Sequence, residues 1–291
     1  MRVAGVAATL LALVGVVALV GPAHGAYRGR NGVIVFERGG DLYTLRPSDG
    51  KVLRRLTKNE GLNTSPTWSP SGKQIAFASD RNTQENDVYV MNADGSGQTD
   101  IASLDREDSH SPSWSPAGTR IVFVRDLNDA AGEDLYVMNA DGSDVHRIVT
   151  APGFDNSPAW SPDGKLIAYA HETLLRTVRP DGSGMRTLAK NAGQPSWSPS
   201  GRRIAYICGT HICTIGRTGA KRRQLTHGSA ADSAPAWSPD GRLIVFTSDR
   251  AFLHRGVQTA DLYVMHSNGT HPRRLTRDRV DDFAPDWQPR P

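Results

Sequence analysis

Three aspartates recur at one position of a repeated phrase, and their carboxylates are the groups of this chain best suited to chemistry. Each lies five residues before a tryptophan, at Asp155, Asp232 and Asp282. Oxygen-rich groups of this kind suit Ca2+ or the cationic side chain of a peptide. The alternative is that these aspartates cap turns by accepting hydrogen bonds from nearby backbone N–H groups. The candidate binding residues at or beside this position are Asp108, His110, Asp155, Asp232, Asp281 and Asp282.

Catalytic motifs are few. His110 with Asp108 and Asp155 is the one combination that could begin a metal site for a lyase, which needs several histidines or carboxylates meeting at one point. The chain has no phosphate-binding loop, dinucleotide fingerprint or cysteine nucleophile motif. We therefore expect no catalytic residue, metal ligand or cofactor, with Ca2+ in a central channel as the one ion to test. An enzyme that uses the channel, such as a metal-dependent polysaccharide lyase or a lactonase-like hydrolase, is the alternative class.

A second candidate region is the longest loop, residues 248–260, which joins the second and third strands of one repeat. Apolar side chains interrupt its polar sequence and could contact a partner. They could equally belong to an insertion that packs against its own repeat. The candidate binding residues in it are Phe252, His254 and Arg255.

The elements that position these residues come from an internal repeat. All six tryptophans lie in copies of one phrase, and successive copies are 37 to 50 residues apart. A period close to 40 to 50 residues is typical of the four-stranded blades of a β-propeller.

Each repeat divides into four expected strands. After the tryptophan strand comes a tight turn such as Asp163-Gly164, and then an apolar second strand such as Gln74 to Ala78. A third strand begins with an acidic-apolar-aromatic step such as Asp87-Val88-Tyr89, and an Asn/Asp-Gly hairpin leads to a short basic fourth strand such as Arg54 to Thr57. Positive charge on that outermost strand would discourage pairing with another molecule.

The two ends of the chain predict the number of blades. Gly32 to Thr57 supply strands two, three and four without a tryptophan strand, whereas Phe283 to Gln288 supply a tryptophan strand with nothing after it. Five full repeats and this composite one make six blades. We therefore expect an all-β fold, a six-bladed β-propeller of four-stranded antiparallel blades, closed by pairing the C-terminal tryptophan strand with the three N-terminal strands.

The N-terminus reads as a targeting segment. Arg2 precedes the apolar run Val3 to Val20, and small residues follow Pro22 at a cleavage site. Residues 1–25 are thus expected to be a signal peptide, or an uncleaved anchor, and residues 26–291 the propeller of an exported monomer. No second hydrophobic segment predicts a further membrane span, and the net charge of +4 is too small and dispersed to indicate nucleic acid binding.

The chain has two cysteines, Cys208 and Cys213, which flank a very short connection between a second and a third strand. A hairpin there would bring the two sulfurs within bridging distance, and in an exported protein they should oxidise. We expect a disulfide with modest stabilisation, because the closed loop is small.

The repeated pattern Ser-Pro-Ala-Trp-Ser-Pro-Asp-Gly-Lys, followed by Ser-Asp-Arg, Asp-Leu-Tyr-Val-Met-Asn-Ala-Asp-Gly and Arg-Arg-Leu-Thr, resembles the WD40-like propeller repeat (PD40) of the TolB family. The resemblance covers everything after the signal segment. TolB itself carries an α/β domain ahead of its propeller, for which we see no counterpart, so the resemblance implies a TolB-like propeller rather than a place in a Tol-Pal system. Similar repeats accompany prolyl oligopeptidase-like hydrolase domains, but no Gly-x-Ser-x-Gly elbow occurs here.

Strand order predicts where a site would lie. The turns between strands one and two and between strands three and four share one face, and their sequences repeat with little change. The connections from strand two to three and from strand four to the next blade share the other face and differ from blade to blade, as binding loops on a rigid scaffold do. We expect a non-catalytic exported protein that binds a protein, a peptide or an envelope glycan through this variable face.

Overall fold

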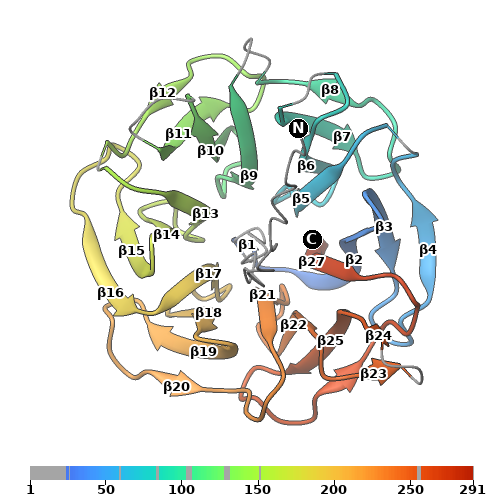
Figure 1. Cartoon of the computed structure of the whole chain (residues 1–291). Helices are drawn as coiled ribbons and strands as arrows, with labels where there is room; N and C mark the ends of the chain where they lie inside the picture. Colours follow the sequence, from blue (N-terminus) through green and yellow to red (C-terminus); the bar gives the residue numbers. More distant parts are fainter. Residues whose placement is uncertain are drawn as a thin grey trace, which may run out of the picture.

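The computed structural model describes residues 24–25, 27–58, 60–82, 85–102, 107–127, 132–150, 152–253 and 257–290. In this part of the chain six sheets stand in a ring around a central axis (Figure 1). The tryptophan strand of each sheet lies nearest the axis, and the later strands follow outward. The expected six-bladed β-propeller is confirmed.

The blades are numbered in chain order. The first blade consists of β27 (Asp282–Arg290), β2 (Arg30–Arg38), β3 (Asp41–Leu45) and β4 (Val52–Arg55). The second consists of β5 (Asn63–Trp68), β6 (Gln74–Ser79), β7 (Asp87–Asn92) and β8 (Thr99–Asp100). The third consists of β9 (Asp108–Trp114), β10 (Arg120–Asp126), β11 (Glu133–Asn139) and β12 (His146–Arg147).

The other three blades follow the same order. The fourth consists of β13 (Asp155–Trp160), β14 (Ile167–His171), β15 (Leu174–Val178) and β16 (Arg186–Lys190). The fifth consists of β17 (Ala192–Trp197), β18 (Arg203–Cys208), β19 (His211–Gly216) and β20 (Arg223–Gln224). The sixth consists of β21 (Asp232–Trp237), β22 (Leu243–Ser248), β25 (Asp261–His266) and β26 (Arg273–Arg274).

The turn after each tryptophan explains the repeated Ser-Pro-x-Gly. In the fourth blade Gly164 N donates to Ser161 O at 2.9 Å, and Leu166 N donates to Ser161 Oγ at 2.9 Å. The same two bonds recur after Trp68, Trp114, Trp197 and Trp237. The serine thus fixes the turn through both its backbone and its side chain.

A bulge interrupts every tryptophan strand. The residue three positions before each tryptophan has a positive φ, between 46° at Ala234 and 54° at Ser65, and a proline follows it. Pairing with the second strand shifts register there in all six blades. Such bulges re-aim the side chains beyond them. Here the bulge sets the first residue of the strand opposite the end of strand two, as in the pair Asp232 and Ser248.

The core lies between neighbouring blades. Trp68, Ile75 and Phe77 of the second blade pack on Val35 and Leu42 of the first, and each of the other five clusters likewise joins two adjacent blades. The hairpin glycines press on the preceding blade. A Cβ at Gly142 would lie 2.2 Å from Ile101 O, so no larger residue fits.

Ring closure occurs where the sequence predicts it. β27 pairs antiparallel with β2, with Trp287 opposite Ile34 and Asp282 opposite Arg38. In the outer part of this joint a hairpin glycine again lies against the preceding blade, since a Cβ at Gly50 would lie 2.0 Å from Leu275 O. The joint between the sixth and first blades is therefore built like every other joint.

The N-terminal segment differs from the simple blade plan. β1 (His24–Gly25) runs parallel to β17 in the middle of the ring, which makes the fifth sheet five-stranded (Figure 1). Arg28 Nε then donates to Pro199 O at 3.3 Å as the chain leaves the centre. The free edge of an innermost strand accepts such an extended segment, and nothing in the repeat pattern indicates it. Residues 1–23, where most of the expected signal peptide falls, lie outside the described residues.

A second addition is a small hairpin in the longest connection. β23 (Phe252–Leu253) pairs antiparallel with β24 (Val257–Gln258) and with no other strand. Across the described residues, no helix has the length and apolar character needed to cross a membrane.

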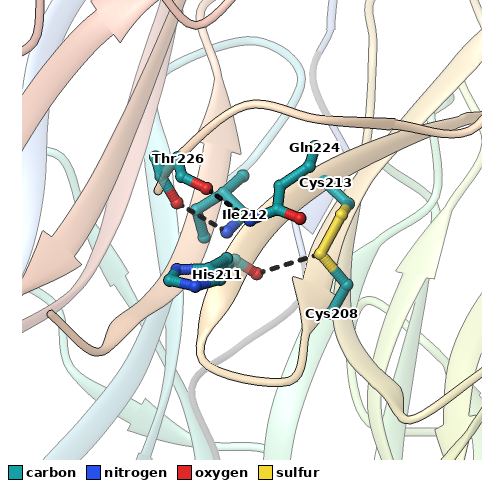
Figure 2. The surroundings of a disulfide bond; sticks show 6 residues. All are labelled: Cys208, His211, Ile212, Cys213, Gln224 and Thr226. Carbon is teal, nitrogen blue, oxygen red and sulfur yellow. Dashed lines mark hydrogen bonds between the residues drawn. A yellow bond between two sulfur atoms is a disulfide. The ribbon is translucent and has the colours of Figure 1, made fainter. Parts of the chain in front are cut away.

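The expected disulfide is present. Cys208 ends β18 and Cys213 lies in β19, with their Cα atoms 5.8 Å apart (Figure 2). Cys213 is fully buried, and Cys208 Sγ lies 3.5 Å from His211 O. On the outer side Ile212 N donates to Thr226 Oγ1 at 2.9 Å, so the hairpin is fixed on both sides.

Two carboxyl groups, buried Asp286 and half-buried Glu37, hold the first and second blades together. Asp286 Oδ2 of β27 accepts the backbone N–H of Trp68 at 2.8 Å, and Glu37 accepts that of Ser65. Burial raises the pKa of Asp286 to about 7 against the opposing effect of these N–H donors. Burial likewise raises the pKa of Glu37 to about 7, against the hydrogen bond from Ser65.

These pKa values predict a pH dependence of stability. Because both pKa values are higher in the folded state, the folded chain binds the protons more tightly, and stability is lost as pH rises through about 7. Glu37→Gln and Asp286→Asn keep an acceptor oxygen and remove the titration. Each should reduce the fall in unfolding free energy between about pH 5 and about pH 8 by about 1 to 3 kcal/mol.

Urea unfolding at several pH values measures this. Asp94→Asn is the matched control, because Asp94 is exposed and its hydrogen bonds to Ser96 lower its pKa, so it titrates below the window. Equal slopes for the parent and both core variants would contradict the assignment.

The disulfide gives a second prediction. Cys208→Ala combined with Cys213→Ala should lower the unfolding free energy by about 2 kcal/mol, the loop-closure value for so short a loop. Reduction of the parent protein should lower its melting temperature, whereas the double variant should not respond. Two free thiols in the unreduced protein, found by alkylation and mass spectrometry, would refute the bond.

Candidate functional site

The variable connections meet on one face of the ring, which we call the loop face. The connections from strand two to three and from strand four to the next blade lie side by side there. Asp80 N donates to Leu62 O at 3.3 Å, and Asp249 N donates to Ala231 O at 3.2 Å. The first residue of every tryptophan strand lies directly beneath these connections.

Two of the three predicted aspartates form internal ion pairs. Asp282 accepts from Arg38 Nε at 2.6 Å and from Arg38 Nη2 at 2.8 Å, a bidentate contact. Asp232 accepts from Arg250 Nη2 at 2.6 Å. Asp282 is fully buried, and burial raises the pKa of its carboxyl group although Arg38 opposes that rise. Each carboxylate is thus matched by a guanidinium of its own blade.

In four blades an arginine lies over an aromatic pair. Arg38 lies 5.1 Å from the ring centroid of Phe36 and 5.7 Å from that of Tyr43, within the range of cation–π contacts. Arg125 of the third blade has the same register as Arg38, whereas Arg81 of the second blade and Arg250 of the sixth reach their aromatic pairs from two residues further along the chain. In the second and third blades the acceptors are Asn63 Oδ1 at 2.6 Å and Ser109 Oγ at 3.2 Å.

In the second and sixth blades the Ser-Asp-Arg motif places this arginine. Arg250 Nε donates to Ser248 Oγ at 2.8 Å, which folds the arginine back over its own strand. Asp249 Oδ1 accepts the N–H of Ala231 at 2.8 Å and so caps the connection into the next strand. The acceptor at the start of the tryptophan strand and the side chains of the Ser-Asp-Arg motif are therefore bonded to other groups of the fold.

The fourth blade replaces the arginine by a histidine. His171 Nδ1 lies 2.7 Å from Asp155 Oδ1, and both side chains are buried. Burial, reinforced by the charge of Asp134, raises the pKa of Asp155 to about 8. Burial together with the charge of Arg176 lowers the pKa of His171. Both shifts disfavour the charged forms of these two side chains.

The fifth blade replaces the whole arrangement. Its strand-one residue is Ala192, which pairs with Cys208, and Cys213 pairs with Tyr206 at the register where the first, second, third and sixth blades carry the third-strand tyrosine. The disulfide thus occupies the place of the arginine and its aromatic contact (Figure 2).

The remaining predicted residues are spread over the loop face. Asp108 Oδ1 accepts from Asn86 N at 3.3 Å, and Asp281 Oδ1 accepts from Ala260 N at 2.7 Å. His110 Nδ1 lies 3.0 Å from Ser111 Oγ, and its Nε2 lies 3.7 Å from a carboxylate oxygen of Glu133.

The loop candidates are only partly covered by the structure. The backbone of Phe252 belongs to β23, whereas His254 and Arg255 lie outside the described residues. Within the described part of the chain, no three His, Cys, Asp or Glu side chains are arranged to hold a metal ion.

A cavity of about 330 Å3 opens on the loop face between the fourth and fifth blades. It exists where the repeat is broken, because Ala192 and Gly193 begin β17 where the sixth blade has Asp232 and Ser233. Its lining combines apolar Ala170, Ala192 and Ile207 with polar Asn156, Glu172 and Gln194. Small ligand-binding pockets typically combine these two kinds of surface.

Three large apolar side chains stand out of the loop face. Leu62 is 58% exposed, Phe154 is 54% exposed and Val280 is 46% exposed, and each lies one or two residues before a tryptophan strand. Leu62 and Val280 flank the turn between β2 and β3, since a Cβ at Gly40 would lie 3.1 Å from Leu62 Cδ2 and one at Gly39 would lie 3.7 Å from Val280 Cγ1. Sequence reasoning missed these residues, although an apolar residue just before the strand-one position is a visible signal.

The repeat is similar to that of known proteins. Residues 27–130 match the family model described as the TolB beta propeller domain. The Tol-Pal system protein TolB of Francisella tularensis subsp. mediasiatica is 42% identical over 52 residues, which is 18% of this chain. The match spans only 12% of the length of that relative.

Solved structures extend the likeness to the whole ring. TolB from Acinetobacter baumannii superposes with a TM-score of 0.76 at 19% identity, over 89% of this chain and 67% of that one. A chain of a nidogen/laminin complex superposes with a TM-score of 0.72 at 11% identity, over 88% of this chain and 98% of that one. At these identities the structures establish the fold alone. Together with the repeat match over residues 27–130, they show that the chain resembles the TolB-like PD40 β-propeller repeat proteins.

Proposed function

We propose that this propeller is an exported, non-catalytic binding module that recognises a protein or peptide through its loop face. The observation that carries the proposal is the set of three exposed apolar side chains there, Leu62, Phe154 and Val280. Exposed apolar groups on a rigid polar surface are typical of sites where a partner docks.

The cavity between the fourth and fifth blades supports the same face. It lies beside Phe154, because Phe154 N donates at 3.1 Å to Glu172, which lines the cavity. A side chain of a partner could enter the cavity while Phe154 contacts the partner's surface. The similarity to a protein of a Tol-Pal system supports a protein ligand over an envelope glycan.

Export and the monomeric state belong to the same proposal. The sequence pattern of residues 1–25 is that of a signal peptide, and the Cys208–Cys213 disulfide is stable in an oxidising compartment. The ring joins its own ends, so no sheet edge at the closure requires a second copy.

The enzyme alternative has less support. The strand-one carboxylates Asp232 and Asp282 are matched by arginines, and Asp155 is bonded to His171, so these groups are engaged with the scaffold rather than with one another. No observation among the described residues supports Ca2+ in the channel, a metal-dependent lyase or a lactonase-like hydrolase.

The test is capture of partners on the immobilised mature protein from an envelope extract of the source organism. Replacing Leu62, Phe154 and Val280 together by serine should lower recovery of the specific partner at least about tenfold, because central apolar contacts carry most interface energy. Leu53→Ser combined with Met185→Ser is the matched control, since these residues are 45% and 44% exposed but lie on the outer strand and hairpin of their blades. Undiminished capture by the loop-face variant, or equal loss in the control, would refute the proposal.

A further inference from the structure

A second hollow lies on the opposite face of the ring, which carries the Ser-Pro-x-Gly turns. It measures about 710 Å3 and opens between the fifth and sixth blades. Four arginines line it, and we call it the arginine pocket: Arg28, Arg202, Arg203 and Arg223. All four are exposed to solvent.

These arginines differ from the others of the ring. Arg38, Arg125 and Arg250 are matched by acidic or polar groups of their own blades, and Arg217 pairs with Asp163 at 2.8 Å. None of the four pocket arginines forms an ion pair with a residue that the structure describes.

One acidic residue, Asp240, lines the arginine pocket, and it is already engaged. Its Oδ1 accepts from Ser238 Oγ at 2.6 Å and from Arg242 N at 3.0 Å. Four guanidinium groups against one carboxylate leave a net positive charge in a concave surface, which concentrates the potential.

The tryptophan of this joint also lines the pocket. In the two preceding joints a guanidinium lies over the ring, Arg120 at 5.2 Å from Trp160 and Arg217 at 5.5 Å from Trp197. Arg203 holds the position equivalent to Arg120, but its Nη1 lies 3.5 Å from Thr214 Oγ1 instead. Trp237 lines the pocket and at 5% is the most exposed of the six tryptophans; like Trp68, Trp114 and Trp287, it has no guanidinium from the described residues over its ring.

The lining defines a ligand chemistry. Guanidinium forks bind carboxylate and phosphate oxygens in pairs. Ser200, Ser267 and Asn268 add hydroxyl and amide groups that can bond to sugar hydroxyls, and the edge of Trp237 offers an apolar contact. The volume exceeds what a single oxyanion fills and lies in the usual range of ligand sites.

We propose that the arginine pocket binds an acidic glycan, a sugar chain that carries carboxylate or phosphate groups. The pocket lies across the ring from the loop face, so this activity is independent of partner docking there. Both could operate together, with the glycan holding the propeller while the loop face recruits a partner.

The experiment is titration calorimetry of the mature protein with three oligomers of similar length: oligogalacturonate for carboxylates, oligo(glycerol phosphate) for phosphates, and a neutral maltooligosaccharide. We expect binding of at least one acidic oligomer, weakened when salt is raised from about 50 mM to about 300 mM. Arg202→Gln combined with Arg223→Gln should weaken that binding at least about tenfold.

Arg54→Gln combined with Arg186→Gln is the control, because it removes the same charge from exposed arginines outside the pocket and should leave the affinity within about twofold of the parent. Whether the carboxylated or the phosphorylated oligomer binds more tightly identifies the source of the oxyanion. Binding of the neutral oligomer with equal affinity, equal weakening in the control variant, equal binding of an oligonucleotide, or no binding of either acidic oligomer would overturn the proposal.

Discussion

The pairing of the C-terminal strand β27 with β2 is the interaction on which the rest of the structure depends. β27 supplies the innermost strand of the first blade, with Trp287 packed beside Ile34 and Phe36 in the cluster shared with the sixth blade. Without it the first blade would lose its inner strand, and two sheet edges would be open to solvent. Closure therefore fixes the spacing of all six joints, including the two that hold the cavity and the arginine pocket.

Once the ring is closed, the inner ends of the blades must bury polar groups beneath the loops. The fold answers this with one repeated contact, a guanidinium stacked on two aromatic rings and bonded to the first residue of the tryptophan strand. The fourth and fifth blades depart from it, through the Asp155–His171 pair and the disulfide. The loop-face cavity lies between these two blades. The loop face therefore departs from the repeated arrangement where the sequences of the blades depart from the repeat.

Much of this was predictable from the sequence, for a physical reason. A single blade cannot bury its faces alone, so blades must pack side by side. The spacing of the tryptophans and the turn glycines predicts the number of blades. The first blade, whose strands come from both ends of the chain, predicts the closure. The disulfide between Cys208 and Cys213 was equally predictable, because only a hairpin separates the two cysteines. The parallel strand β1 was not, since two residues at the end of an apolar leader carry no strand pattern.

The site was harder to predict because side-chain partners depend on the bulge. The sequence indicates that Asp232 and Asp282 share a position, but not that the bulge turns them away from one another toward Arg250 and Arg38. Surface hollows depend on contacts that do not form, such as a guanidinium over Trp237. An absent contact leaves no mark in a repeat pattern.

Hydrogen exchange of the intact chain, followed peptide by peptide, tests the closure most directly. The account predicts that the segment covering β27 exchanges as slowly as the one covering β21, because each is the inner strand of a complete blade and opens only when the ring unfolds. Rapid exchange of β27, at the rate of an unpaired C-terminus while β21 stays protected, would contradict it.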